Sequence, residues 1–215
     1  MIIQDKILSG ERPLYGSRDL RLERVTIGEG ESALKECRRI EAHDCEIQGM
    51  YVFWECEDVE CRNCRFASSD RAPLWYGKNI RMHDCIMDAP KVFRELDGLT
   101  LENIQISDGA EAFWYCKNGH LSNLNMQRAE YAFMQSHKLQ INNLTLQGKY
   151  TFQYARNIEI HNAVLDTKDA FWNSEDCTIY DSDVKGEYLG WYARNLRLVR
   201  CRISGTQPLC YCENL

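Results

Sequence analysis

The segments HKLQINNLTLQGKYTFQYA (residues 137–155) and RNIEIHNAVLDTKDAFWNS (156–174) decide the fold. Each opens with a polar pair, alternates apolar and polar residues, passes an Asn, alternates again, and closes on an aromatic run. KNIRMHDCIMDAPKVFREL (78–96) and DGLTLENIQISDGAEAFWYC (97–116) follow the same order. Self-similarity at a period of about 20 residues identifies a tandem repeat that continues from Arg18 onward.

The alternation within each segment has a period of two, which predicts strands rather than helices. Four columns of the repeat stay apolar or small in nearly every segment, as expected when each coil buries one face against the next. We therefore predict an all-β fold: a single-stranded right-handed parallel β-helix of about ten coils of roughly 20 residues, with three short strands per coil. Leucine-rich repeats are the main alternative, but their helical half is missing.

One column between two apolar positions is Asn or Asp in eight of ten segments. These residue types tolerate the left-handed backbone conformation and bond locally, so they suit a tight bend between two strands. We predict equivalent corners at Asn103, Asn123, Asn143 and Asn162. Amides stacked in this way can also bond from coil to coil.

The ends differ from the repeat. Residues 1–17 do not match its pattern, so we expect an N-terminal cap over 1–17 and a β-helix repeat domain over 18–215. No comparable segment follows the last coil. Exposed strand edges recruit further strands unless they are covered, so we expect a homodimer through the C-terminal edge.

Composition narrows the compartment and the partners. The 215 residues are 44% hydrophobic and 27% charged, with a net charge of −6, which is typical of a globular protein and disfavours nucleic acid as a partner. No apolar run is long enough to span a membrane, and no secretory signal is recognisable. We therefore expect a cytoplasmic protein whose eleven cysteines remain free thiols.

The cysteines also bear on metal binding. Cys61 and Cys64 have the C-x-x-C spacing, but Cys45, Cys64 and Cys85 share one inward column, which spaces their sulfurs along a line. A structural zinc site needs four ligands that converge on one centre. We expect these thiols to fill the core and predict neither a metal nor another cofactor.

The candidate site is the third strand of the coil, where one column contains all five tryptophans of the chain. Because Lys and Arg share this column with Trp, we expect it to face outward. The following column is also amphipathic. The candidate binding residues from the two columns are Lys35, Trp54, Trp75, Arg94, Trp114, Trp172 and Trp191, with Glu36, Glu55, Glu95, Tyr115 and Tyr192.

Aromatic faces of this kind suit sugar rings and protein partners. The alternative is that the rings only stack on one another as a ladder. Glu36, Glu55 and Glu95 could supply carboxylates for a polysaccharide lyase or glycosidase, since coil spacing alone places pairs of them at separations compatible with hydrolysis. We favour a binding or scaffold protein with a carbohydrate or protein ligand, keep a carbohydrate-active enzyme as the alternative, and assign no catalytic residue.

Several segments carry a family resemblance: GERPLYGSRDL (10–20), GESALKEC (30–37), APKVFREL (89–96), KDAFWN (168–173), GEYLGWYARNL (186–196) and QPLCYCENL (207–215). They resemble an uncharacterised, mainly bacterial β-helix family known only as a domain of unknown function. The resemblance implies an architecture similar to that of pectate lyases and supplies no catalytic residues. Members of that family usually continue for several more coils.

Overall fold

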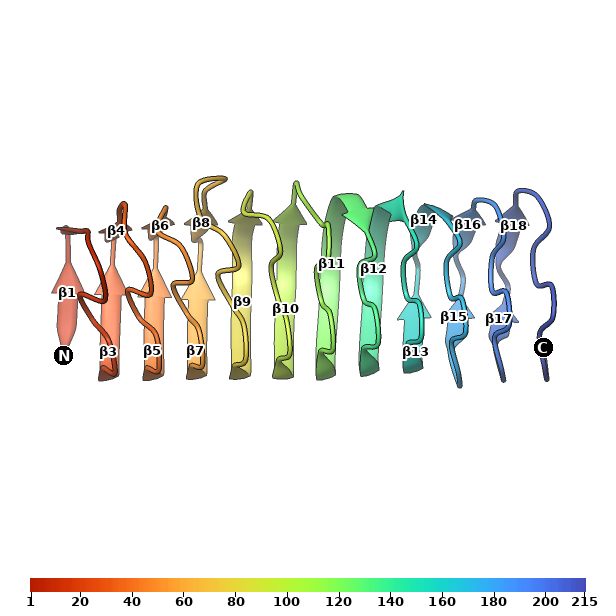
Figure 1. Ribbon diagram of the computed structural model, residues 1–215, viewed down its shortest axis with the longest axis horizontal. Helices are drawn as coiled ribbons and strands as arrows, with labels where there is room; N and C mark the ends of the chain where they lie inside the picture. Colours follow the sequence, from red (N-terminus) through yellow and green to blue (C-terminus); the bar gives the residue numbers. More distant parts are fainter.

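The computed structural model describes residues 1–215 as a right-handed parallel β-solenoid of about eleven coils of roughly 19 residues, without any helix (Figure 1). The two termini lie at opposite ends of the rod. At about 4.8 Å between neighbouring coils, the rod is on the order of 50 Å long. The predicted all-β, parallel β-helix architecture is confirmed.

Two sides of each coil carry the strands, and every pairing is parallel between one coil and the next. The first side carries β1 (Ile2–Gln4), β3 (Arg18–Glu23), β5 (Arg38–His43), β7 (Glu57–Arg62), β13 (Arg156–His161), β15 (Thr178–Tyr180) and β17 (Arg197–Val199). The second side carries β2 (Ile7–Leu8), β4 (Thr26–Ile27), β6 (Glu46–Ile47), β8 (Arg65–Phe66), β14 (Val164–Lys168), β16 (Asp183–Lys185) and β18 (Arg202–Ser204). Four strands in the middle of the rod run through both sides: β9 (Lys78–Met87), β10 (Asp97–Ile106), β11 (Lys117–Glu130) and β12 (His137–Lys149).

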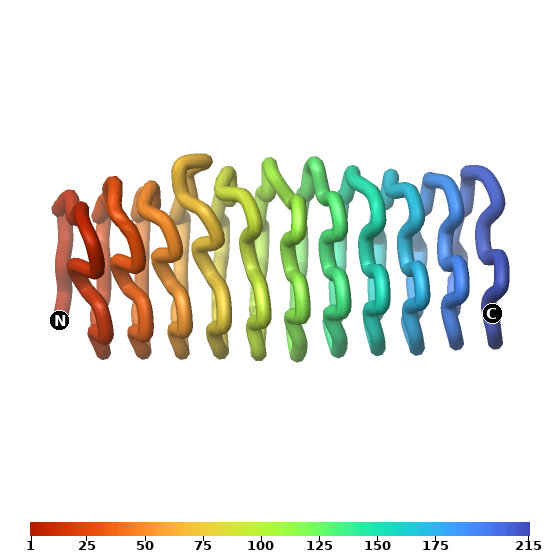
Figure 2. The backbone as a smooth tube through the Cα atoms, in the orientation of Figure 1, coloured from red at the N-terminus to blue at the C-terminus, as the bar shows by residue number.

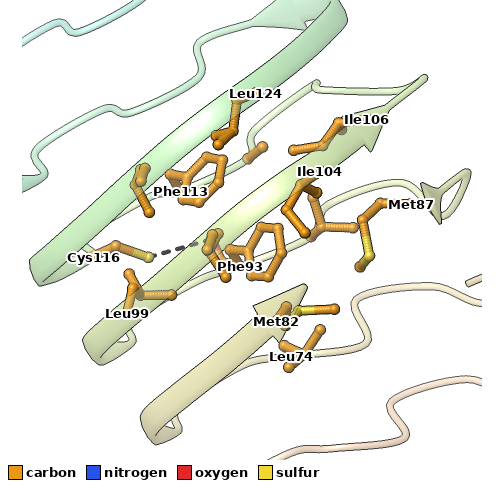
Figure 3. Packing of buried hydrophobic residues seen from close by; sticks show 14 of the residues in the cluster. Leu74, Met82, Met87, Phe93, Leu99, Ile104, Ile106, Phe113, Cys116 and Leu124 are labelled. Carbon is orange, nitrogen blue, oxygen red and sulfur yellow. Dashed lines mark hydrogen bonds between the residues drawn. The ribbon is translucent and has the colours of Figure 1, made fainter. Parts of the chain in front are cut away.

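The core is a set of columns that run along the rod, because residues in register point inward in every coil. Five phenylalanines form its centre, with adjacent ring centroids 4.5 to 4.7 Å apart. Figure 3 shows Phe93 and Phe113 between the aliphatic side chains of the two strand sides. All five rings are fully buried, so this column supplies much of the hydrophobic stabilisation of the fold. The five are Phe93, Phe113, Phe133, Phe152 and Phe171.

The predicted corner between the first and second sides is confirmed. Asn103, Asn123, Asn143 and Asn162 have φ angles between 54° and 57°, in the left-handed region. The amides also form the expected ladder: Asn123 Nδ2 donates to Asn103 Oδ1, and Asn143 Nδ2 donates to Asn123 Oδ1, both at 2.9 Å.

The N-terminal segment forms a coil in register with the repeat, although its sequence does not show the repeat pattern. β1 pairs with β3, and β2 pairs with β4, in the register of all later coils. Asp5 occupies the corner position with a φ of 54° and accepts two hydrogen bonds from Arg24. The two strands of this segment, Ile2–Gln4 and Ile7–Leu8, are too short for an alternating pattern to be recognised in the sequence.

The third side of the coil is built from turns and isolated bridges, where the sequence suggested a third short strand. Alternate residues there have positive φ, for example Lys91, Phe93 and Glu95 at 57°, 57° and 51°. The backbone consequently winds back and forth on this side, as the tube in Figure 2 shows. Two buried residues are followed by two outward-facing ones on this side, as at Ala112 and Phe113, then Trp114 and Tyr115.

Candidate functional site

The tryptophan column lies on the outside of the third side, as predicted. Each of its indoles is half-buried, whereas the residue before it in the chain is buried in the core. Four indole N–H groups are held by the protein itself, because each donates to a backbone carbonyl of the next coil. The donors and acceptors are Trp54 to Ala72 (2.7 Å), Trp75 to Lys91 (2.7 Å), Trp114 to Tyr131 (2.6 Å) and Trp191 to Gln207 (2.7 Å).

In the N-terminal half the column is a continuous stack of cations and rings. Trp54 and Trp75 are parallel within 7°, with their ring centroids 5.3 Å apart. The guanidinium of Arg94 lies between the rings of Trp75 and Trp114, 4.8 Å and 4.9 Å from their centroids. Lys35 lies 6.0 Å from the Trp54 ring and closes the stack. The faces of these rings are therefore largely occupied by one another, which is the ladder that the sequence left open as an alternative.

The C-terminal half is different. Trp172 and Trp191 are tilted by 46° with their centroids 6.3 Å apart, so they do not form a parallel stack. Trp172 also lacks the hydrogen bond that the other four tryptophans donate to the next coil. The tryptophans from Trp54 to Trp114 are thus stacked and hydrogen-bonded within the protein, whereas the indole N–H of Trp172 has no acceptor in the protein.

The column beside the tryptophans carries a tyrosine in every second coil over much of its length. Tyr76, Tyr115, Tyr154 and Tyr192 are each between 40% and 48% exposed, and Tyr211 is 67% exposed. Between them stand the polar residues Glu95, Gln135 and Asn173. Where two tyrosines occupy consecutive coils, as at Tyr192 and Tyr211, their rings stack with a centroid separation of 4.9 Å and an angle of 9°.

A hollow of about 370 Å³ lies at the C-terminal end of this column. Its volume falls within the usual range of about 300–1,000 Å³ for small-molecule sites. Tyr154 and Tyr192 stand two coils apart, with the short side chain of Asn173 between them. The side-chain amide of Asn173 makes no hydrogen bond within the protein. The hollow is lined by Tyr154, Asn173, Tyr192 and Tyr211 together with Arg156, Ser174, Glu175, Arg194 and Glu213.

The charged residues of the hollow belong to a third column, at the start of the first side. Glu175 pairs with both neighbouring coils: its carboxylate accepts a hydrogen bond from Arg194 at 2.9 Å and forms an ion pair with Arg156 at 3.6 Å. These side chains are held in place by one another while they keep hydrogen-bonding capacity toward solvent. The hollow therefore offers aromatic faces, an unpaired amide and alternating charges, which together can bind a ring that carries hydroxyl groups.

The other predicted residues lie further toward the N-terminus and outside this hollow. Lys35 Nζ is 3.9 Å from Glu36 and 3.5 Å from Glu55, so one cation serves both carboxylates. The hydroxyl of Tyr15 donates to Glu36 at 2.6 Å, and this contact raises the pKa of Tyr15. Glu95 lies 3.8 Å from Arg94. All three carboxylates are exposed and sit beside cations.

Eight of the eleven cysteines are buried in the core, and most of their thiols donate to backbone carbonyls of the preceding coil; Cys64, for example, reaches the oxygen of Ala42 at 3.2 Å. Burial raises the pKa of Cys116 to about 12 and that of Cys177 to about 11, so both are protonated at neutral pH. No three His, Cys, Asp or Glu side chains converge as a metal site would require. The chain also has no helix that could cross a membrane.

Larger hollows, of about 550 and 470 Å³, lie over the first side, and one of about 440 Å³ lies over the second side. Their linings are mostly charged and polar and contain no Phe, Tyr or Trp. Several of their charges are already engaged with one another, as where Arg39 Nε donates to Asp19 at 2.6 Å. The hollow beside Tyr154 is therefore the stronger candidate on chemical grounds.

The sequence prediction covered only part of this site. It included Trp172, Trp191 and Tyr192 but not Tyr154, Asn173, Tyr211 or the charged residues Arg156 and Arg194. The alternation of tyrosine with polar residues at every second coil is visible in the aligned repeats and could have indicated the site. Which indole lacks a hydrogen bond depends on the path of the next turn, which the repeat pattern does not specify.

The fold and this face define a parallel β-solenoid with one outward aromatic side. The chain belongs to the family described as "Protein of unknown function (DUF3737)", whose model matches residues 1–215. No curated protein matches its sequence.

Solved structures of other β-solenoids are similar to it at low identity. The pentapeptide-repeat protein HetL from Nostoc sp. strain PCC 7120 is 11% identical, with 98% of this chain and 88% of that chain covered and a TM-score of 0.34. Tailspike protein 3 of bacteriophage CBA120 is 11% identical, with 100% and 47% covered and a TM-score of 0.42. The surface adhesin PfbA of Streptococcus pneumoniae is 5% identical, with 93% and 70% covered and a TM-score of 0.43.

Proposed function

We propose that this protein is a carbohydrate-binding β-solenoid and that the hollow between Tyr154 and Tyr192 receives a sugar ring. The proposal rests on two features that occur together in one coil, or rung, of the solenoid. In that coil Asn173 interrupts the tyrosine column, and the indole N–H of Trp172 has no protein acceptor. Ring faces and free polar groups thus occur together.

The spacing supports a ring-shaped ligand. Consecutive tyrosines of the column stack 4.9 Å apart, so tyrosines two coils apart leave one rung of the stack vacant. An apolar sugar face packs against an aromatic ring, while its hydroxyls need hydrogen-bonding partners. Asn173 offers both a donor and an acceptor at this rung, and Arg156, Glu175 and Arg194 line the side of the hollow.

Binding is favoured over catalysis by the placement of the carboxylates. A general acid or base must reach the bond that it acts on, within hydrogen-bond distance of the reacting group. Glu36, Glu55 and Glu95 are distant from the hollow along the rod and lie beside Lys35 and Arg94. Glu175 lines the hollow, but both of its carboxylate oxygens are engaged in ion pairs with Arg156 and Arg194.

A glycan screen monitored by tryptophan fluorescence tests the proposal, since Trp172 and Trp191 pack against Tyr192 at the edge of the hollow. We expect at least one soluble oligosaccharide to change the emission saturably, and we expect Tyr154→Ala and Tyr192→Ala each to weaken its binding at least tenfold. Tyr180→Ala is the matched control, because Tyr180 stacks on His161 on the first side of the solenoid. Equal losses in all three variants, or no binding by any glycan, would overturn the proposal.

A further inference from the structure

A column of charged residues runs along the corner between the third and first sides and alternates in sign. Register places its members in consecutive coils, and close contacts join them: Arg38 to Glu57 (3.5 Å), Glu57 to Lys78 (3.6 Å) and Asp97 to Lys117 (3.3 Å). Toward the C-terminus the alternation resumes with Arg156, Glu175 and Arg194. Such a ladder neutralises itself along most of the rod.

Apart from Arg18 and Arg38 in the first coils of the column, the alternation fails at one place. Lys117, His137 and Arg156 occupy three consecutive coils, and no acidic residue separates them. Lys117 and Arg156 have acidic partners on their outer sides, in Asp97 and Glu175. His137 has none, and Lys138 adds another cation next to it without an ion pair of its own.

The residues around His137 disfavour its protonated form. Burial, followed by the positive charges of Lys117, Lys138 and Arg156, lowers the pKa of His137, and Asp97 opposes this only in part. A histidine among cations gains a proton readily only when a negative charge arrives. The corner is therefore a place where an anionic group would be stabilised.

The same coils carry the tyrosine column. Tyr115 and Tyr154 stand on either side of Gln135, two positions before Lys117, Arg156 and His137 in the respective coils. Gln135 is exposed and its side-chain amide makes no protein hydrogen bond, as at Asn173. The order of tyrosine, side-chain amide and tyrosine is the same as at Tyr154, Asn173 and Tyr192, but two coils nearer the N-terminus. Three cations here take the place of the alternating charges.

We infer that the rung of Gln135 and His137 binds the carboxylate-bearing sugar of an acidic glycan, as an extension of the hollow between Tyr154 and Tyr192. This inference rests on the proposed function. The cationic stretch spans only three coils and is bounded by Asp97 and Glu175, so it suits one or two negative groups. A nucleic acid backbone would meet these acids and the net charge of −6, both of which repel it.

D-Glucuronate and D-glucose are the probes, because they differ only in the carboxylate at one carbon; sodium acetate supplies the anion alone. NMR titration of the histidine rings reports the pKa of His137 in each solution. We expect glucuronate to raise this pKa by about 1 unit. We also expect glucuronate to bind at least fivefold more tightly than glucose, with acetate producing no comparable shift.

Two variants test whether the preference for glucuronate comes from this corner. Lys117→Gln combined with His137→Gln should abolish the preference for glucuronate and leave glucose binding unchanged. Lys78→Gln is the matched control: it removes a cation from the same column where Glu57 and Asp97 already compensate it, so the preference should persist. Circular dichroism and thermal unfolding establish that both variants remain folded.

The outcomes separate this inference from the proposed function. Equal binding of glucose and glucuronate, lost in Tyr154→Ala, would overturn the acidic-sugar assignment and keep the sugar-binding hollow. An equal response to acetate and glucuronate would show an anion site without sugar recognition and would also overturn it. Absence of binding by both sugars, when the glycan screen has found a neutral ligand, overturns this inference alone; absence in both experiments overturns both proposals.

Discussion

The guanidinium carbon of Arg94 lies 4.8 Å from the centre of the Trp75 ring. Trp114 covers its opposite face at 4.9 Å, so the cation takes the place of a ring in the stack. Its Nε is buried without a hydrogen bond of its own, and Glu95 lies 3.8 Å away. Contacts to two aromatic faces thus replace much of the solvation that the charge has lost.

Arg94→Gln should lower the free energy of unfolding by about 1–2 kcal/mol, because each aromatic contact of a cation contributes about 0.5–1 kcal/mol. Urea denaturation measures the change. Arg128→Gln is the control: Arg128 is exposed and its only acidic neighbour, Asp108, is 3.9 Å away, so the loss there should stay below about 0.5 kcal/mol. Equal losses in the two variants would show that the stack does not stabilise the fold.

Gly186 allows two coils to approach closely. Its φ is 154°, and a Cβ atom placed on it would lie 2.0 Å from the backbone oxygen of Thr167. Gly186→Ala should therefore force neighbouring coils apart and lower the midpoint of thermal unfolding by several degrees, corresponding to at least about 2 kcal/mol.

Gly16→Ala separates this clash from backbone strain. Gly16 also has a positive φ, of 66°, but no atom lies within 4 Å of the added Cβ. Its cost should be only about 1 kcal/mol, that of an ordinary residue in the left-handed region. If the two alanine variants unfold at the same temperature, the close approach of the coils at Gly186 is not important for stability.

The burial of Asp70 predicts that the stability of the protein depends on pH. It is fully buried in the turn after β8, which protrudes in Figure 1, and neither carboxylate oxygen has a hydrogen bond of good geometry. Burial raises the pKa of Asp70 well above its usual range, and the backbone N–H of Arg71 offsets this only in part. The equivalent positions in the adjacent coils, identified from the backbone bonds of the turn, are Gly49 and Ala89.

The folded state binds the Asp70 proton more tightly than the unfolded state does. Its contribution to stability is therefore fully present below the unfolded pKa of about 4, and is lost as the pH rises toward the higher folded value. Asp70→Ala should remove this loss and stabilise the protein by about 1–3 kcal/mol at neutral pH.

Asp88→Ala provides a comparison of opposite sign. Hydrogen bonds from Ser107 and Arg65 lower the pKa of Asp88, so its contribution is present above the unfolded pKa and is lost as the pH falls through the folded value. Thermal unfolding from pH 4 to 8 should show Asp70→Ala more stable than wild type at pH 8 and Asp88→Ala less stable. A destabilised Asp70→Ala at pH 8 would contradict this account.

Much of the fold follows from the repeat pattern, because stacking in register converts each sequence column into a spatial column. The inward phenylalanines, the Asn ladder at Asn123 and Asn143, and the outward tryptophans could all be predicted in this way. The first coil does not show the repeat pattern because Ile2–Gln4 and Ile7–Leu8 are short. The turns of the third side were missed because the left-handed residues there, such as Phe93 and Glu95, are not residue types that mark a turn in a sequence.

The candidate site could be predicted only in part, because it depends on what each side chain has left to bond. Trp114 and Trp172 occupy equivalent columns, yet only Trp114 donates to a neighbouring carbonyl. Similarly, the sequence places charges in one column but does not show that those at His137 lack acidic neighbours until the register is known. Hydrogen-bond partners and ring orientations require coordinates.

The central claim is that the vacant rung at Asn173 is the sugar-binding position. Asn173→Tyr would place a ring in that rung, and the backbone can accommodate it because Tyr154 and Tyr192 adopt φ angles of 57° and 59° while Asn173 has 51°. Glu55→Tyr is the matched control, since it adds a ring to the same column at a φ of 58° outside the hollow.

Isothermal titration calorimetry of wild type and both variants, with the oligosaccharide that the glycan screen selects, tests this claim most directly. We predict that Asn173→Tyr loses binding at least tenfold while its thermal unfolding midpoint is maintained or raised by the completed stack, and that Glu55→Tyr binds like wild type. A folded Asn173→Tyr variant that binds with wild-type affinity would contradict the account.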